Sequence, residues 1–340
     1  MFIGVKTVSP VITSYPTYAA HLSLADVYLD TSSKETYMNW FILQYISTVC
    51  YLDEKRRGYI LFDNILGGND LPDSKIFYKE IFNGIQIQEE CISFKKFLID
   101  RLKSGFSIFM TLNRKFILEQ NTTYDDNHET LISGYDTDKD CFYLSDFYAG
   151  RKFQKIQVDS VNVEKAFSTF TYLNRPDLAP PDIGFNTNIY TLQRYASLQD
   201  AADVTVVYDP YTLLFMLERW LGAKQIGYLA LGRKCYDIQA ERLQEKNFDL
   251  RNFHLLYDHK IALLKSIEYL ILMKKIPYVE DLLKQVKSLV DKTLILRNRL
   301  IKDRIAQRVM PENWLEQLNS IKHLDEIVFS KLYHLIKKTL

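Results

Sequence analysis

The sequence predicts an α+β protein, in which a domain of helices packed on an antiparallel sheet precedes a domain made of helices alone. Three observations lead to this class. Short strand-forming segments separated by polar turns occupy much of residues 58–158. Residues 174–185 hold three prolines and a glycine, which is typical of a linker. The apolar segments beyond it have helical spacing. We therefore expect one domain over residues 1–175 and a helical domain over residues 186–340.

Two apolar segments near the N-terminus are predicted to be helices. The first begins after Pro16 and extends to Tyr28, so that Thr17 is an N-cap or first-turn residue. The second covers residues 35–50, where the length of the apolar run favours a buried helix. Because the positive end of a helix dipole favours a nucleophile, Thr17 is a candidate for that role as well as for an ordinary cap.

The middle of the chain contains the strands of the expected sheet and two short helices. Residues 93–103 have apolar side chains at helical spacing, and Gly105 is expected to end this helix. The other predicted elements are a strand at 58–66 that ends in a turn, a strand pair or bent strand at 107–118, a strand at 153–158 and a helix at 160–167.

The segment 127–148 is predicted to be a β-hairpin. Residues 129–135 and 141–148 are rich in strand-forming side chains, and the link between them is rich in aspartate. His128 lies at the start of the first strand and Asp146 near the end of the second, so a hairpin in register brings both to one end of a sheet. A histidine oriented by a carboxylate is the general-base part of a nucleophilic site. The plainer interpretation is a surface hairpin with an incidental histidine.

The C-terminal half is predicted to consist of helices whose polar faces carry many charged residues. Such charges usually mark a solvated face, where each ion pair contributes only a few tenths of a kcal/mol. The predicted helices cover residues 211–221, 236–245, 255–272, 278–304 and 312–338.

Composition excludes several classes of function. The formal net charge of +1 gives no reason to expect a nucleic-acid or membrane partner, and only 12 glycines argue against a glycine-rich nucleotide loop. The four cysteines are far apart and form no CxxC pair, which argues against a disulfide framework or zinc site. There is no signal-peptide pattern and no apolar run of the ~20 residues that span a bilayer. We expect a cytoplasmic protein with free thiols and without a cofactor or metal.

The segment from Leu102 to Phe167 contains a glycine before a hydrophobic strand, then NHETLISGYD, then CFYLSDFY. In this order it is similar to the N-terminal domain of the butirosin biosynthesis protein H family, and residues 250–270 resemble the helical part of relatives found beside nonribosomal peptide assembly lines. The resemblance implies a papain-like fold related to bacteriocin-processing cysteine peptidases. It also implies transfer of an acyl group from a carrier-protein thioester to an amine, with a carrier protein or peptide synthetase as partner.

The resemblance implies a cysteine nucleophile at the start of the first helix, and here this chain departs from the family pattern. The matching position holds Thr17, followed by Tyr18 and Ala19. A thiol beside an imidazole ionises near neutral pH, whereas a hydroxyl must pass its proton to His128 in the transition state. The upstream glutamine that helps to bind the oxyanion in papain-like peptidases is also missing.

Three interpretations of Thr17, His128 and Asp146 remain open. Thr17 replaces the cysteine as a weak nucleophile, or another residue such as Cys50 is the nucleophile, or the site is degenerate and the fold binds without reacting. Cys50 ends an apolar segment, as buried structural thiols often do. Cys141 is expected at the end of the hairpin far from the histidine.

Two functions follow from these interpretations. The first is an accessory acyltransferase or peptidase-like enzyme of peptide natural-product biosynthesis that uses Thr17 or a cysteine with His128 and Asp146. The alternative is a catalytically inactive binding or scaffold protein that recognises a carrier protein or synthetase. The sequence does not set the oligomeric state, and the amphipathic helices are compatible with a homodimer.

Overall fold

The computed structural model describes residues 1–52, 58–63, 76–90, 93–117, 127–148, 152–169, 187–196, 198, 208–306 and 313–340. The α+β class is confirmed, with a sheet-rich N-terminal region and a helical C-terminal region. The chain forms two compact units, and each is built from several segments. The first comprises Met1–Pro10, Pro16–Ser33 and Ser74–Val204, and the second comprises Val11–Tyr15, Lys34–Asp73 and Thr205–Leu340.

This division differs from the domain boundary expected from the sequence. Residues 34–73 belong to the helical unit, and residues 188–194, expected in the helical domain, form a strand of the first unit's sheet. The expected linker at 174–185 lies outside the described residues. Hydrophobic periodicity identifies the type of an element but not the core in which that element is buried. Because each unit is built from several chain segments, a single domain boundary cannot describe the division.

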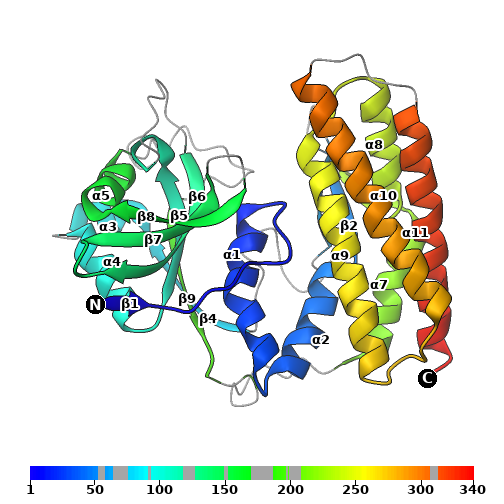
Figure 1. Cartoon of the computed structure of the whole chain (residues 1–340), viewed down its shortest axis with the longest axis horizontal. Helices are drawn as coiled ribbons and strands as arrows, with labels where there is room; N and C mark the ends of the chain where they lie inside the picture. The colour runs from blue at the N-terminus through cyan, green and yellow to red at the C-terminus, as the bar shows by residue number, and fades with distance from the viewer. Residues whose placement is uncertain are drawn as a thin grey trace. The chain divides into compact units, whose positions relative to one another are not determined.

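The first unit contains an antiparallel sheet of seven strands among the described residues, in the order β4-β9-β5-β6-β7-β8, with β1 also paired to β6. Figure 1 shows α1 on one side of this sheet and α3, α4 and α5 on the other. The strands are β1 (Phe2–Gly4), β4 (Phe77–Asn83), β5 (Ser107–Asn113), β6 (Asn127–Asp136), β7 (Cys141–Phe147), β8 (Phe153–Asp159) and β9 (Asn188–Arg194). The helices are α1 (Pro16–Ala25), η1 (Asp26–Asp30), α3 (Gly84–Glu90), α4 (Phe94–Lys103), η2 (Arg114–Phe116) and α5 (Ser160–Ser168).

Both faces of this sheet are covered by helices, which explains why every residue of β5 is buried. One face forms a core with α4 and α5, in which Leu98 and Val163 pack with Met110 and Leu144. The predicted end of α4 is confirmed, because Gly105 adopts a left-handed φ of +83° just beyond it. Strands buried on both faces lack a polar side, so the sequence shows an apolar run there.

The second unit combines long helices with a sheet that has four strands in the described part of the chain. The sheet order is β10-β11-β2-β3, formed by β10 (Gln225–Ile226), β11 (Leu229–Leu231), β2 (Thr48–Leu52) and β3 (Gly58–Phe62). The helices are α2 (Lys34–Tyr45), α7 (Pro210–Gly222), α8 (Lys234–Gln244), α9 (Leu250–Leu272), α10 (Glu280–Ile305) and α11 (Asn313–Lys337). None of the helices described is both long and apolar enough to span a bilayer.

The prediction of one helix over residues 35–50 is wrong in its last third. Helix α2 ends at Tyr45, and Thr48 to Leu52 form a strand that pairs with β3 on one side and β11 on the other. A central strand is an apolar run like a buried helix, and the β-branched residues Ile46, Thr48 and Val49 favour the strand. Cys50 therefore lies in a sheet and does not end a helix.

Some charged residues of the helical unit are buried, contrary to the prediction of solvated polar faces. Lys260 of α9 and Asp325 of α11 are fully buried and form an ion pair. Tyr236 of α8 donates a hydrogen bond to the same carboxylate at 2.7 Å. Lys260 Nζ also donates to Nδ1 of His259 at 2.8 Å, and His259 Nε2 donates to the carbonyl of Ile46 at 3.0 Å. This network specifies how α8, α9 and α11 pack together.

Candidate active site

The predicted hairpin is confirmed, with β6 and β7 paired in antiparallel register. Leu131 lies opposite Ser145, and the register shifts by a bulge between Ile132 and Gly134. The turn closes at Asp140, a non-glycine residue with φ of +52°, whose carboxylate accepts a hydrogen bond of 2.6 Å from Tyr135. Aspartate tolerates this left-handed conformation better than most residues, which is why an Asp-rich link suits this turn.

The hairpin brings His128 and Asp146 together, as the sequence predicts. Nδ1 of His128 lies 2.9 Å from each of the two carboxylate oxygens of Asp146. The amide of Phe147 donates a further hydrogen bond of 2.6 Å to Oδ1. Asp146 is fully buried, whereas the His128 side chain keeps 27% of its surface exposed. The carboxylate is therefore held in the protein interior, while part of the imidazole is exposed to solvent. We call this pair the dyad.

The hydrogen bonds of the dyad set the tautomer of His128. Asp146 is an acceptor, so Nδ1 carries the proton and Nε2 carries the lone pair in the neutral ring. No hydrogen bond engages Nε2 among the described residues. Burial works to lower the pKa of His128, but the hydrogen bond and charge of Asp146 outweigh it and raise this pKa above 6.5. The arrangement suits a general base that accepts a proton at Nε2 while Asp146 stabilises the imidazolium.

Arg114 contacts the dyad and was missed by the sequence analysis. It begins η2, directly after β5, and its guanidinium donates a hydrogen bond of 2.9 Å to the carbonyl of Phe147. The same nitrogen lies 3.7 Å from Asp146 Oδ2. Strand β5 pairs with β6 so that Leu112 lies opposite His128, and this pairing places Arg114, two residues further along, near the site. The only local signal is a basic residue just after a buried strand, which by itself indicates nothing.

Glu129 is the second residue that sequence reasoning missed. It follows His128 on β6, is half-buried, and lies opposite Thr111 on the other face of the sheet from the dyad. Burial raises the pKa of its carboxyl to about 7; the charge of Asp146 acts in the same direction and His128 opposes it. A half-buried acid beside an imidazole is an additional group that titrates near neutral pH.

Thr17 lies in the first turn of α1, as predicted, but the structure does not join it to the dyad. No hydrogen bond between Thr17 and His128 occurs among the described residues. His21 of α1 stacks on Phe77 at 5.7 Å, which places α1 on the face of the sheet that carries Leu131. The alternation of β6 assigns His128 to the opposite face. Helix α1 and the His128 ring therefore belong to opposite faces of the sheet.

All three cysteines in the described part of the chain are buried. Cys50 is buried in β2 of the second unit, and burial raises the pKa of its thiol to about 12. Cys141 pairs with Asp136 at the end of β7 far from Asp146, as predicted. Cys235 is fully buried, and Cys91 lies outside the described residues. Burial raises the pKa of each described thiol, which disfavours the thiolate that a papain-like mechanism uses.

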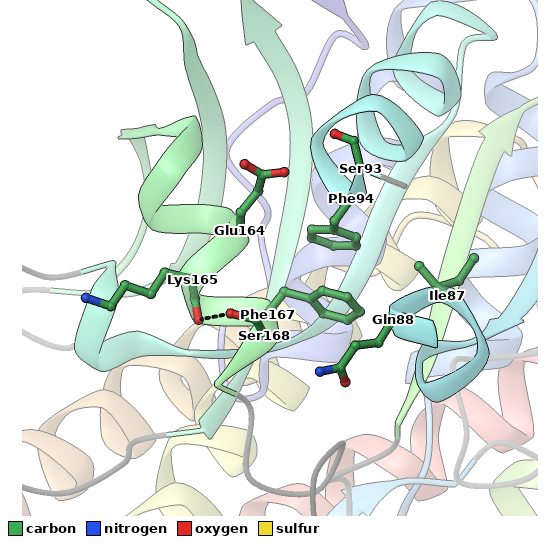
Figure 2. Close-up of a pocket in the computed structure, with 8 residues that line it drawn as sticks. All are labelled: Ile87, Gln88, Ser93, Phe94, Glu164, Lys165, Phe167 and Ser168. Carbon is green, nitrogen blue, oxygen red and sulfur yellow. Dashed lines mark hydrogen bonds between the residues drawn. The ribbon is translucent and has the colours of Figure 1, made fainter. Parts of the chain in front are cut away.

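A separate pocket of about 290 Å³ lies where α3, α4 and α5 meet, and Figure 2 shows its lining. Its floor is the stacked pair Phe94 and Phe167, with ring centroids 3.8 Å apart. Glu164 accepts a hydrogen bond of 3.1 Å from the amide of Lys95, so this carboxylate is already used in capping α4. Lys165 points away from the pocket and lies over the ring of Phe116. The pocket contains no member of the dyad.

No metal-binding cluster of three or more His, Cys, Asp or Glu side chains occurs in the described part of the chain. No protein-family model and no curated protein matches the sequence.

Proposed function

We propose that the first unit is a papain-like domain of a cytoplasmic accessory protein in peptide natural-product biosynthesis, with His128 as the general base of acyl transfer. The observation that carries this proposal is the 2.9 Å contact between His128 Nδ1 and Asp146, with Nε2 facing no hydrogen-bond partner among the described residues. The resemblance to the butirosin biosynthesis protein H family supplies the reaction class. The donor would be an acyl thioester on a carrier protein and the acceptor an amine.

The proposed reaction has two steps. The Thr17 hydroxyl attacks the thioester carbonyl, its proton passes to His128 Nε2, and the carrier thiol leaves with a proton from the imidazolium. The acceptor amine then attacks the resulting ester and passes a proton to the neutral His128 Nε2. The imidazolium returns that proton to the Thr17 oxygen as the ester bond breaks and the amide product is released. Thr17 takes this role from the family pattern, and reaching Nε2 requires it to approach around the start of β6. Asp146 stabilises the imidazolium formed in each step.

The test is product formation from acyl-loaded carrier protein and an amine, comparing the wild type with His128→Ala. Removal of a general base is expected to lower the rate by about 10²-fold or more. His334→Ala is the matched control, because His334 is exposed on α11 and lies in the other unit. An unchanged rate in His128→Ala would eliminate the general-base role.

A catalytically inactive protein that recognises a carrier protein or synthetase is the second candidate. The observations that favour it are the threonine at the nucleophile position and the lack of a hydrogen bond between Thr17 and His128. Calorimetry with loaded and unloaded carrier protein separates the two candidates. Binding without turnover in the wild type, unaffected by His128→Ala, would support this second function.

A further inference from the structure

Arg114 makes two contacts whose chemistry goes beyond packing. The guanidinium holds the carbonyl of Phe147, the residue that follows Asp146, so it fixes the end of β7. It also lies 3.7 Å from the carboxylate that accepts the hydrogen bond from His128 Nδ1. The side chain is only 16% exposed and Asp146 is fully buried, so solvent screens this pair weakly. A guanidinium stays charged at every pH that matters for a protein.

The charge of Arg114 opposes protonation of His128. Asp146 stabilises the imidazolium, and a carboxylate that served His128 alone would hold it strongly in the charged form. Arg114 repels that form and lowers the pKa of His128. An imidazolium has no lone pair at Nε2, so a His128 with too high a pKa is a poor base near neutral pH.

We propose that Arg114 is the positioning residue of the dyad, because its guanidinium anchors the Phe147 carbonyl beside Asp146 and keeps Nε2 of His128 available as a base. The inference rests on the proposed function, since a base is needed only if the dyad accepts a proton. It adds a third member to the site, supplied by η2 from outside the hairpin. The site is then Arg114–Asp146–His128, assembled from η2, β7 and β6.

The charged and titratable groups around His128 come from each element packed against it. Asp146 belongs to β7 and Tyr148 follows directly after this strand, Arg114 belongs to η2, and Glu129 belongs to β6 itself. Tyr148 has its pKa raised far above the usual range by burial, so it stays neutral while His128 titrates. Burial raises the pKa of Glu129 to about 7. Titrations are therefore best repeated in a Glu129→Gln background, where Arg114 and Asp146 remain the charged neighbours that the described residues supply.

The experiment follows the imidazole signals of His128 by NMR as pH is varied, in the full-length protein without substrate. Arg114→Met and Arg114→Gln remove the charge, and Arg114→Lys keeps it. In the neutral variants we expect the pKa of His128 to rise by about 0.5 to 1 unit, and in the lysine variant to stay closer to wild type. Arg101→Met is the matched control, because Arg101 pairs with Glu80 at 2.5 Å in the same unit without contacting the dyad.

The results decide in either direction. A pKa of His128 in both neutral variants that stays within about 0.2 units of wild type would overturn the proposal, because a purely structural arginine leaves that value unmoved. Loss of folding in both neutral variants would also count against it, since Arg114 would then be structural. If the pKa rises but the wild type has no acyl-transfer activity, the positioning role stands and the proposed function fails. If activity exists, its pH profile should shift upward with the pKa.

Discussion

Replacement of Asp146 by asparagine is expected to lower the pKa of His128 from above 6.5 to below 6.5. In the wild type, burial and Arg114 lower this pKa, and the hydrogen bond and charge of Asp146 raise it by more. Asparagine keeps a hydrogen-bond acceptor of similar shape but removes the charge. Two unit charges about 4 Å apart interact by about 1 kcal/mol in water and about 4 kcal/mol at an effective dielectric of ~20. Because 1.36 kcal/mol corresponds to one pKa unit, the pKa of His128 should fall by about 0.7 to 3 units.

The assay is an NMR titration of the six histidines, in which the signal missing from His128→Gln identifies His128. Stability supplies an independent readout. In the wild type, the raised pKa of His128 adds stability that is present below pH 6.5 and lost as pH rises through the folded-state value. In Asp146→Asn the folded-state pKa of His128 is depressed. The contribution of His128 to stability is then present above pH 6.5 and is lost as pH falls through the folded-state value. An unchanged or higher pKa in Asp146→Asn would refute this electrostatic account of the dyad.

Three further predictions concern groups outside the dyad. Lys260→Met should destabilise the second unit by about 3 to 5 kcal/mol, because it leaves buried Asp325 without its cation. Urea unfolding followed by tryptophan fluorescence measures this loss, since all three tryptophans lie in the second unit. A loss below about 1 kcal/mol would contradict the prediction. Burial raises the pKa of Glu129 to about 7, so the wild type should lose stability as pH rises from 4.5 to about 7, and Glu129→Gln should not show this loss. Thermal melts at about pH 5 and about pH 8 measure it. An equal change in melting temperature between the two pH values in both proteins would speak against the prediction. Cys50 should resist alkylation in the folded protein because its pKa is raised to about 12, and rapid native labelling found by mass spectrometry would be inconsistent with its burial.

The dyad was predictable because its determinants are local. His128 and Asp146 are joined by a single hairpin, whose strand propensity and Asp-rich turn can be read from one stretch of sequence. Arg114 was not predictable in this way. It reaches the dyad through the pairing of β5 with β6, and local patterns do not encode which strands pair. The start of α1 was predicted for the same local reasons, but not the face of the sheet on which α1 packs.

Burial was the second source of error. The strand at residues 48–52 resembled the end of a buried helix, because an apolar run in the centre of a sheet has no alternation to reveal it. The charged residues of the C-terminal helices were expected on solvated faces. Lys260 is instead buried, and its partner Asp325 lies 65 residues away along the chain. Both errors arise where the tertiary environment overrides a local pattern.

The central claim is that His128 acts as a base for acyl transfer through the threonine that starts α1. The most direct measurement is mass spectrometry of the protein after incubation with acyl-loaded carrier protein, with the modified residue mapped by peptide fragmentation. We predict an acyl ester on Thr17 that is absent from His128→Ala. An acyl group on a cysteine, or an adduct on Thr17 that forms equally without the imidazole, would contradict the account.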